Sequence, residues 1–318
     1  MKKVILWGSR TEYDFYYKYF EVEILKSNMK IEAVILNEEH LFSVIDGTEV
    51  IKIDELLMRQ YDYLIDMNHK EPQTVRKILE LLNISLEKVI PARVFSLPSF
   101  DLNRYIKVRE SRISIIANHC WGGYTYNNLG MQFLSPFINL FVEPEDYLKL
   151  LNDFDYYMEL PLHYIREEYE PRLKRNYPVI GLEDVVLHFN HYTDFDSAVD
   201  IWNKRKSRIN KDNLLVEMAI GRHEDIEKFS ALPFQYKIGL TTIPCREKGV
   251  LYCPIPSEDY LENKYAGNIF NFFNHVALRA ADEYRYYDIL KLLNHEKDFT
   301  RFAGIGLLNF DCTGNLRM

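Results

Sequence analysis

Short apolar runs alternate with amphipathic stretches along the first hundred residues. Strands are predicted at residues 3–7, 31–36, 50–53, 63–67 and 89–90. Helices are predicted after Gly8, from Asp54 to Met58 and from Pro72 onward, and Asp46-Gly47 predicts a tight turn. Parallel strands need crossover connections, which helices supply. We therefore expect residues 1–97 to form a small Rossmann-like domain whose parallel sheet is covered on both faces.

A second alternating series follows a polar connection. Residues 98–112 are rich in Arg and Lys and are expected to be a linker. Strands are predicted at residues 113–117, 138–142, 185–189, 214–220 and 237–242, and helices at residues 144–151 and 194–208. Thr193 and Asp196 resemble a capping box at the start of the last helix. We expect residues 113–254 to form a second α/β domain.

The last part of the chain is predicted to be helical. Residues 263–294 repeat large apolar side chains at near-helical spacing, which predicts one long or two consecutive amphipathic helices within a C-terminal segment of residues 255–318. This aromatic stripe either seals the core or forms the interface of a homodimer. The fold class as a whole is therefore α/β with C-terminal helices.

The net charge and the hydropathy of the chain argue against several classes of function. With 39 Lys and Arg against 47 Asp and Glu, the net charge is −8, which disfavours nucleic acid as a main partner. The longest apolar stretch, residues 133–142, is interrupted by polar residues and is too short for a membrane span. The N-terminal apolar run is too short for a signal peptide, so we expect a cytoplasmic protein.

The cysteines are few and widely spaced. Cys120, Cys245, Cys253 and Cys312 form no close pair, so neither a disulfide framework nor a zinc ribbon is expected, and the thiols should be reduced.

A glycine at the end of the first strand suggests a nucleotide site. Gly8, Ser9 and Arg10 stand where a following helix N-terminus can approach a phosphate, and Asn37 follows the second strand, where it could meet a ribose hydroxyl. The full GxGxxG motif is absent, so a structural turn is the alternative.

The segment from Asn118 to Gly123 is the first candidate for chemistry. Cys120 follows an apolar strand, and a helix N-terminus and a nearby imidazole would lower the pKa of its thiol. Such a thiol is a plausible nucleophile. Gly122 and Gly123 would leave backbone amides open to an oxyanion or a phosphate, with Trp121 beside them. The alternative is a small buried cysteine in a tight turn.

Two histidines at the end of a later strand supply a candidate base. His188 and His191 lie at the carboxyl end of the strand predicted at residues 185–189, which is where ligands bind in open α/β sheets. Only one of them is expected to face the site, because side chains alternate across a strand. As a metal pair they lack a third ligand, so no metal site is predicted, and no cofactor is assigned.

The end of the helix predicted at residues 194–208 is basic. Several of its charges are explained by the negative end of the helix dipole. Arg205, however, shares a face with Trp202, so it needs an anionic partner, which is either a protein carboxylate or a bound phosphate or sugar acid. Arg208 and Asn213 extend this candidate anion site.

These motifs together resemble a bacterial family of unknown function whose members are often labelled exopolysaccharide biosynthesis proteins. The resemblance covers about residues 112–242. It is carried by the Asn118–Gly123 turn, Leu129-Gly130, Ser135-Pro136, Tyr177-Pro178, residues 188–192, Trp202, Arg205, Arg208-Ile209-Asn210 and Asn213. The family pattern has Asn where this chain has His119. The first domain looks like the small Rossmann-like domains that accompany sugar-modifying acyltransferases and methyltransferases.

The resemblance implies a context, cell-surface carbohydrate synthesis, and neither a reaction nor any catalytic residues. Our leading hypothesis from the residues themselves is a cytoplasmic enzyme of surface-polysaccharide synthesis, a transferase acting on a sugar or nucleotide sugar. Cys120 would be the nucleophile or a ligand contact, His188 or His191 the base, and Arg205 or Arg208 the anion clamp. The alternative from another class is a non-catalytic protein that binds a nucleotide sugar or acts as a scaffold in polysaccharide assembly. A third is a structural α/β protein whose motif residues only specify turns.

Overall fold

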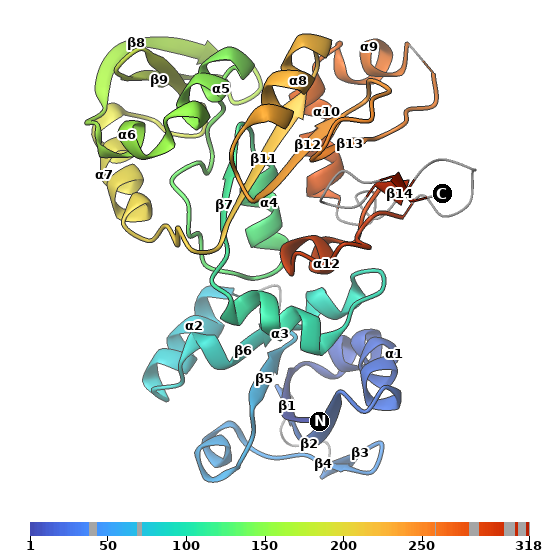
Figure 1. Cartoon of the computed structure of the whole chain (residues 1–318). Coiled ribbons are helices and arrows are strands. Elements are labelled where there is room, and N and C mark those ends of the chain that lie inside the picture. The colour runs from blue at the N-terminus through green and yellow to red at the C-terminus, as the bar shows by residue number, and fades with distance from the viewer. Residues whose placement is uncertain are drawn as a thin grey trace. The chain divides into compact units, whose positions relative to one another are not determined.

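The chain folds into two compact units, each with its own parallel sheet. The computed structural model describes residues 1–37, 43–68, 72–257, 259–279, 286–301, 309–310 and 316–317. The first unit comprises Met1–Ile106 with Asn128–Gly130, and the second comprises Lys107–Asn127 with Met131–Met318 (Figure 1). The α/β class is confirmed, because strands of both parallel sheets alternate with helices along the chain.

The first unit contains a four-stranded parallel sheet of order β2-β1-β5-β6. Its strands are β1 (Lys2–Gly8), β2 (Met29–Leu36), β5 (Tyr63–Asp66) and β6 (Val89–Pro91), its α-helices are α1 (Arg10–Leu25) and α2 (Pro72–Leu81), and its 3-10 helices are Ile53–Met58, Leu86–Lys88 and Ala92–Ser96. Ser9 and Glu12 form the capping box of α1. The strands predicted at residues 3–7, 31–36, 63–67 and 89–90 and the helices predicted after Gly8 and from Pro72 are present in the structure.

Two predictions for the first unit are wrong in detail. Residues 50–53 form no strand; instead β3 (Val44–Ile45) and β4 (Thr48–Glu49) make a short hairpin across Asp46-Gly47, where both residues have positive φ. The 3-10 helix that follows begins after Lys52, not at Asp54.

The segment expected to be a linker contains a helix. Helix α3 (Leu102–Glu110) buries Leu102, Tyr105 and Val108 completely, and these residues recur at helical spacing. The four basic residues of the segment concealed this apolar stripe in the sequence.

The second unit combines a parallel and an antiparallel sheet. The parallel sheet has the order β13-β12-β11-β7 and the antiparallel sheet the order β10-β9-β8 (Figure 1). The strands are β7 (Ser114–Ala117), β8 (His163–Glu170), β9 (Arg175–Leu182), β10 (Val185–His188), β11 (Leu214–Ile220), β12 (Tyr236–Thr241) and β13 (Val250–Tyr252). The helices are α4 (Trp121–Asn128), α5 (Pro144–Asn152), α6 (Phe154–Glu159), α7 (Phe195–Lys206), α8 (His223–Ala231), α9 (Tyr260–Tyr265), α10 (Ile269–Leu278) and α12 (Ile289–Leu293). Two further short strands, β14 (Asn309–Phe310) and β15 (Leu316–Arg317), pair antiparallel.

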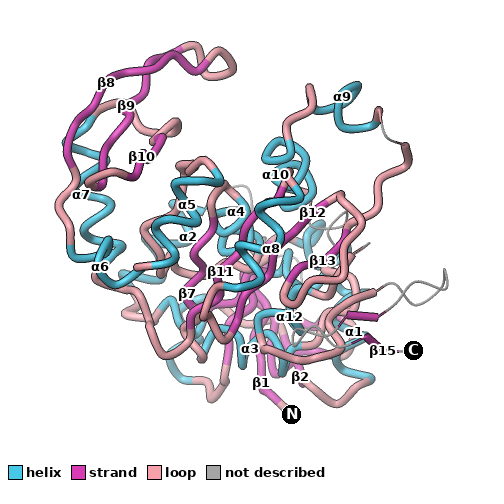
Figure 2. The backbone as a smooth tube through the Cα atoms, turned by 45° about the horizontal axis from the view of Figure 1, so that its top comes forward, coloured by secondary structure: helices cyan, strands magenta, loops and turns pink. Residues whose placement is uncertain are grey.

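The antiparallel sheet corrects the predicted position of one strand. The strand predicted at residues 185–189 exists as β10, but it pairs with β9 outside the parallel sheet. Residues 138–142 form no strand, and Phe141 only makes an isolated bridge to His188. Figure 2 shows β8 and β9 running side by side as a long ribbon. Strand β8 is mostly exposed and carries charged residues at successive positions, so it offered no alternating apolar pattern.

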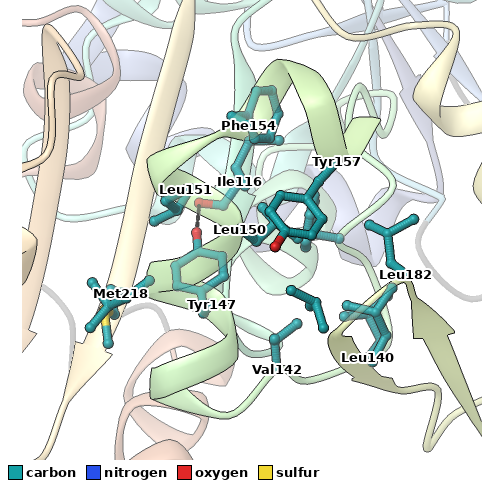
Figure 3. Packing of buried hydrophobic residues seen from close by; sticks show 14 of the residues in the cluster. Ile116, Leu140, Val142, Tyr147, Leu150, Leu151, Phe154, Tyr157, Leu182 and Met218 are labelled. Carbon is teal, nitrogen blue, oxygen red and sulfur yellow. Dashed lines mark hydrogen bonds between the residues drawn. The ribbon is translucent and has the colours of Figure 1, made fainter. Parts of the chain in front are cut away.

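One face of the parallel sheet carries the large core of the second unit. Side chains of Ile116, Val216 and Met218 pack there against α5, α7 and α8 and against the antiparallel sheet. Tyr147 of α5 is fully buried in this core, and its hydroxyl lies 2.9 Å from the carbonyl oxygens of both Ile116 and Glu217 (Figure 3). This hydroxyl therefore ties α5 to β7 and β11 at once.

The opposite face of the sheet is covered by α4 and α10. A Cβ added to Gly122 would lie 3.2 Å from Cγ2 of Ile115, so glycine allows α4 to approach β7 closely. Helix α10 buries Phe272, Phe273, Val276 and Ala277.

The C-terminal aromatic stripe serves the core of the chain itself. Its apolar face continues in α12, where Leu290 and Leu293 are buried. Ala280 and Tyr284, which belong to the predicted stripe, lie outside the described residues. A homodimer through these helices stays a prediction.

Helix α7 is capped by a different residue from the one expected. Asp194 is its N-cap and accepts a hydrogen bond from the backbone N–H of Ser197, whereas the predicted capping box used Thr193 and Asp196.

Within the ranges that the structure describes, no helix combines the length and the apolar character needed to cross a membrane.

Replacing Tyr147 by Phe should lower the free energy of unfolding by about 1–3 kcal/mol, because two buried carbonyl groups lose their shared donor. Urea unfolding followed by circular dichroism measures this change. Tyr164→Phe is the control, because that side chain is 51 % exposed and should have little effect. A Tyr147→Phe protein as stable as the wild type would contradict the role of this hydroxyl.

Candidate active site

The candidate site lies where the turn after β7 meets the loop after β10. Val142 donates its N–H to the carbonyl of Asn118, and the neighbouring Phe141 exchanges two backbone hydrogen bonds with His188. These bonds place residues 141–142 between the two loops. The carboxyl end of a strand in an open parallel sheet is the usual position of ligands in this class of fold.

Cys120 and His191 face each other across this junction. The sulfur Sγ of Cys120 lies 3.7 Å from Nε2 of His191. Cys120 is 8 % exposed, whereas His191 is exposed, so the pair lies at the protein surface. The two residues that the sequence analysis selected as nucleophile and base are thus brought together, although they are 71 positions apart in the chain.

The thiol does not have the lowered pKa that the sequence led us to expect. Burial raises the pKa of Cys120 to about 11, and the positive charge of Arg172 opposes this only in part. Partial desolvation lowers the pKa of His191, and the charges of Arg175 and Arg172 lower it further, while Glu170 raises it. Both partners are therefore neutral at pH 7. The expected lowering of the thiol pKa is wrong, because desolvation by burial outweighs the opposing charge of Arg172.

Gly122 and Gly123 are buried in the first turn of α4. The first backbone hydrogen bond of this turn runs from the N–H of Tyr124 to the carbonyl of Cys120. Close packing explains the glycine at position 122, and a Cβ on Gly123 would make an ordinary contact with Ile138. An amide cradle for an anion at these glycines stays a prediction.

Asn118 and Trp121 are engaged inside the protein. Oδ1 of Asn118 accepts the N–H of Ala219 on β11, and Nε1 of Trp121 donates to the hydroxyl of Tyr287. Both side chains are fully buried, so they hold the turn in place and present no surface to a ligand.

His188 is turned toward the antiparallel sheet. Its ring stacks on Phe141 at 4.4 Å, and Nδ1 lies 3.4 Å from a carboxylate oxygen of Glu168, to which Tyr177 also donates a hydrogen bond. Burial lowers the pKa of His188, and Glu168 opposes the shift. As the sequence analysis expected, one of the two histidines faces Cys120, and it is His191.

Trp202 and the basic end of α7 do not join this site. Trp202 is buried against Phe137 and Phe189. The guanidinium of Arg205 donates to the hydroxyl of Tyr192 at 2.7 Å and lies over the ring of Phe133. Among the described residues it pairs with no carboxylate, and a bound phosphate or sugar acid at Arg205 stays a prediction.

Arg208 and Asn213 lie toward the amino ends of the strands, opposite to the carboxyl ends where Cys120 lies. Arg208 donates to the carbonyl of Phe133, and the carbonyl of Asn213 accepts the N–H of Ser114, the first residue of β7. Cys120 follows the last residue of that strand. These contacts do not bring Arg208 or Asn213 to the thiol, and their role in binding an anion stays a prediction.

In the first unit, a carboxylate occupies the position expected for a phosphate. Glu12 accepts hydrogen bonds from the backbone N–H and the hydroxyl of Ser9 at the start of α1. Arg10 pairs with Asp14 at 2.9 Å, and the predicted ribose contact, Asn37, donates to Asn68. A Cβ on Gly8 would lie 2.7 Å from Cβ of Met67, so this glycine serves packing. A negative charge at the helix N-terminus disfavours a second anion there.

The sequence analysis missed a buried polar group beside Cys120. His119 is fully buried, with Nε2 3.1 Å from Glu217 and Nδ1 2.8 Å from Asn274 on α10, and its ring stacks on Phe270. The sequence signal that could have revealed this buried group is Glu217, a single glutamate in the otherwise apolar strand β11. Two arginines near His191, Arg172 and Arg175, were also missed. Among the described residues, no cluster of His, Cys, Asp and Glu fits a metal ion.

Two family models match successive parts of the chain. Residues 92–294 match the model of a domain of unknown function, DUF1919, and residues 1–90 match the model described as C2185-like, N-terminal. An uncharacterized protein of Haemophilus influenzae (strain ATCC 51907 / DSM 11121 / KW20 / Rd) is 30% identical over 205 residues, which are 62% of this chain and 92% of the relative. The chain therefore belongs to the DUF1919 family, and the predicted membership of a family of unknown function is confirmed.

Cys120 should react slowly with iodoacetamide near neutral pH. Its rate should rise about tenfold per pH unit from pH 8 and level off only near pH 11, because the thiolate is the reactive form. Mass spectrometry of the Cys120 peptide measures this rate, with urea-denatured protein as the reference. A rate already maximal at pH 7 would contradict the neutral pair.

His295 should make stability depend on pH. Its ring stacks on Tyr236, and Nε2 lies 2.7 Å from Oδ1 of Asn213. Burial, and then the charge of Lys107, lowers its pKa from 6.5 to about 4. The unfolded chain therefore binds a proton between these values that the folded chain does not, so the contribution to stability is complete above pH 6.5 and is lost as the pH falls toward 4.

From pH 7 to pH 5 this loss should amount to about 1–2 kcal/mol. Urea unfolding at both pH values should show a smaller loss in His295→Gln than in the wild type. His223→Gln, at an exposed position on α8, is the control. Equal losses in the wild type and in His295→Gln would rule out this contribution.

Proposed function

We propose that this protein is an enzyme of cell-surface polysaccharide biosynthesis, a transferase that acts on a sugar or nucleotide sugar at Cys120 and His191. The observation that carries the proposal is the 3.7 Å approach of Sγ to Nε2 at the carboxyl edge of the parallel sheet. The polysaccharide context comes from the resemblance of residues 112–242 to proteins labelled in that way.

Because Cys120 and His191 are both neutral at pH 7, the thiol would have to give up its proton during the reaction. In the transfer step, Sγ of Cys120 forms a bond to the electrophilic carbon of the donor while the thiol proton passes to Nε2 of His191. The leaving group departs with the bonding electron pair and takes the proton from His191. The acceptor then attacks the same carbon, its proton returns through His191, and the thiol is restored. A histidine with a lowered pKa is neutral at pH 7 and can accept that first proton.

The proposal also assigns a compartment and a small-molecule partner. Cys120, Cys245 and Cys253 are free cysteines, which suits the reducing cytoplasm. A sugar or nucleotide sugar is the partner that the polysaccharide context suggests, and the exposed face of His191 gives it access to the thiol.

One observation favours a second function. A thiol whose pKa is raised to about 11 by burial is a poor nucleophile until a base removes its proton. The rival is therefore a non-catalytic protein that binds a nucleotide sugar or holds a polysaccharide assembly together. Such a protein would tolerate the loss of Cys120 and His191.

Complementation of a deletion strain separates the two functions. Cys120→Ser and His191→Gln should each reduce surface polysaccharide to the level of the deletion strain, because loss of a nucleophile or base costs about 100-fold or more in rate. Cys245→Ser, at a partly buried cysteine, and His223→Gln are the matched controls and should restore output. Thermal unfolding of each purified variant confirms folding. Wild-type output from folded Cys120→Ser and His191→Gln proteins would overturn the enzyme and favour the rival.

A further inference from the structure

Arg175 is a half-buried arginine whose Nε has no hydrogen-bond acceptor among the described residues. It begins β9, and this Nε atom is buried. Across the described residues it also forms no ion pair. A buried donor without an acceptor is destabilising, and a planar guanidinium is suited to bind the oxygens of an anion.

The surroundings of Arg175 are the candidate active site. The N–H of Phe189 donates to the carbonyl of Pro178 on β9, so the start of β9, where Arg175 lies, runs beside the loop that carries His191. In keeping with this, the positive charge of Arg175 lowers the pKa of His191, and that of Arg172 lowers the pKa of both His191 and Cys120. Arg172 lies in the turn between β8 and β9 and donates to Oδ1 of Asn271 on α10 at 2.6 Å. The hairpin thus carries two guanidinium groups next to the Cys120–His191 pair in a chain whose net charge is −8.

Glu170 is the acidic residue of this cluster. It is paired in register with Arg175 across the hairpin, but its carboxylate lies 3.8 Å from Nε of Arg172. The cluster of Glu170, Arg172 and Arg175 therefore contains one carboxylate and two guanidinium groups, so it carries a net positive charge.

A second buried polar atom, on the residue that precedes His191, also lacks a hydrogen-bond partner among the described residues. Oδ1 of Asn190, the residue before His191, is buried and accepts no hydrogen bond from the described protein. An amide oxygen needs a donor, such as a sugar hydroxyl. Arg175 thus offers donors to an anionic group, and Asn190 offers an acceptor to a hydroxyl.

We propose that Arg175, assisted by Arg172, binds the anionic group of a phosphorylated sugar and so places the sugar at Cys120 and His191. This inference rests on the proposed function and specifies its substrate class. Guanidinium groups bind phosphate and carboxylate in the same bidentate geometry, so a sugar acid shares the chemistry and is distinguished by the experiment. Arg175 is a specificity-determining residue in this proposal, and the thiol and imidazole keep their roles.

Isothermal titration of the full chain tests the anion site. The probes are glucose 1-phosphate, glucuronic acid, glucose and inorganic phosphate. Glucose 1-phosphate should bind at least about tenfold more tightly than glucose, and Arg175→Gln should weaken its binding by at least about tenfold. Arg175→Lys should recover part of the loss. Lys211→Gln is the control, because it removes the same charge at an exposed site paired with Asp155.

NMR of histidine-labelled protein supplies a readout that folding alone would not move. The charge of Arg175 lowers the pKa of His191, so Arg175→Gln should raise that pKa. Saturating glucose 1-phosphate should raise it in the wild type, because the phosphate neutralises the guanidinium. The spectrum of His191→Gln assigns the signal.

Each outcome decides the proposal. Tighter binding of glucuronic acid than of glucose 1-phosphate would overturn the phosphate and identify a carboxylate. The anion site would be overturned if neither glucose 1-phosphate nor inorganic phosphate bound at millimolar concentration. It would also be overturned if Arg175→Gln left both the binding and the titration of His191 unchanged. If Cys120→Ser abolishes polysaccharide while Arg175→Gln binds normally, only this inference fails. If Cys120→Ser and His191→Gln retain output, the proposed function fails whatever Arg175 binds.

Discussion

The turn after β7 depends on satisfying polar groups where water cannot reach. Asn118 and His119 are fully buried, and most of their polar atoms find partners on other segments: Ala219 and Val142 for Asn118, Glu217 and Asn274 for His119. Among the described residues, Nδ2 of Asn118 and Oε2 of Glu217 are left without a hydrogen-bond partner. An unsatisfied polar group in such a place would cost several kcal/mol. The backbone of Cys120 follows directly, so the position of its sulfur is set by these hydrogen bonds. The side chains that flank the thiol act as scaffold.

Much of the fold follows from hydrophobic pattern alone. Strands such as β1, β7 and β11 are mostly apolar and buried because both faces of a parallel sheet are covered, and such stretches are visible in a sequence. The hairpin of β8 and β9 was missed because β8 is mostly exposed and charged and has no apolar side to reveal it. Helix α3 was mistaken for a linker for a related reason, since exposed charges dilute its narrow buried stripe.

The sequence could predict which loops carry the candidate site. It could not predict the pKa values or the charge partners of the side chains there. Cys120 and His191 both follow strands, and the topology of α/β sheets favours an encounter between such loops. The sign of the change in the pKa of the thiol was not accessible, because it depends on how much protein surrounds the sulfur. Arg205 shows the same limit. Its helical face indicated an inward guanidinium, but Tyr192 and the ring of Phe133 are neutral partners that no spacing rule could identify.

The exposure of β8 has an evolutionary consequence. Residues with most of their surface in water contribute little to the core, so they can be exchanged at small cost in stability. A ribbon of this kind, attached to a rigid sheet, allows the charge and shape next to the thiol to diverge while the scaffold beneath stays the same. Homologous chains that handle different molecules would then differ mainly in this hairpin.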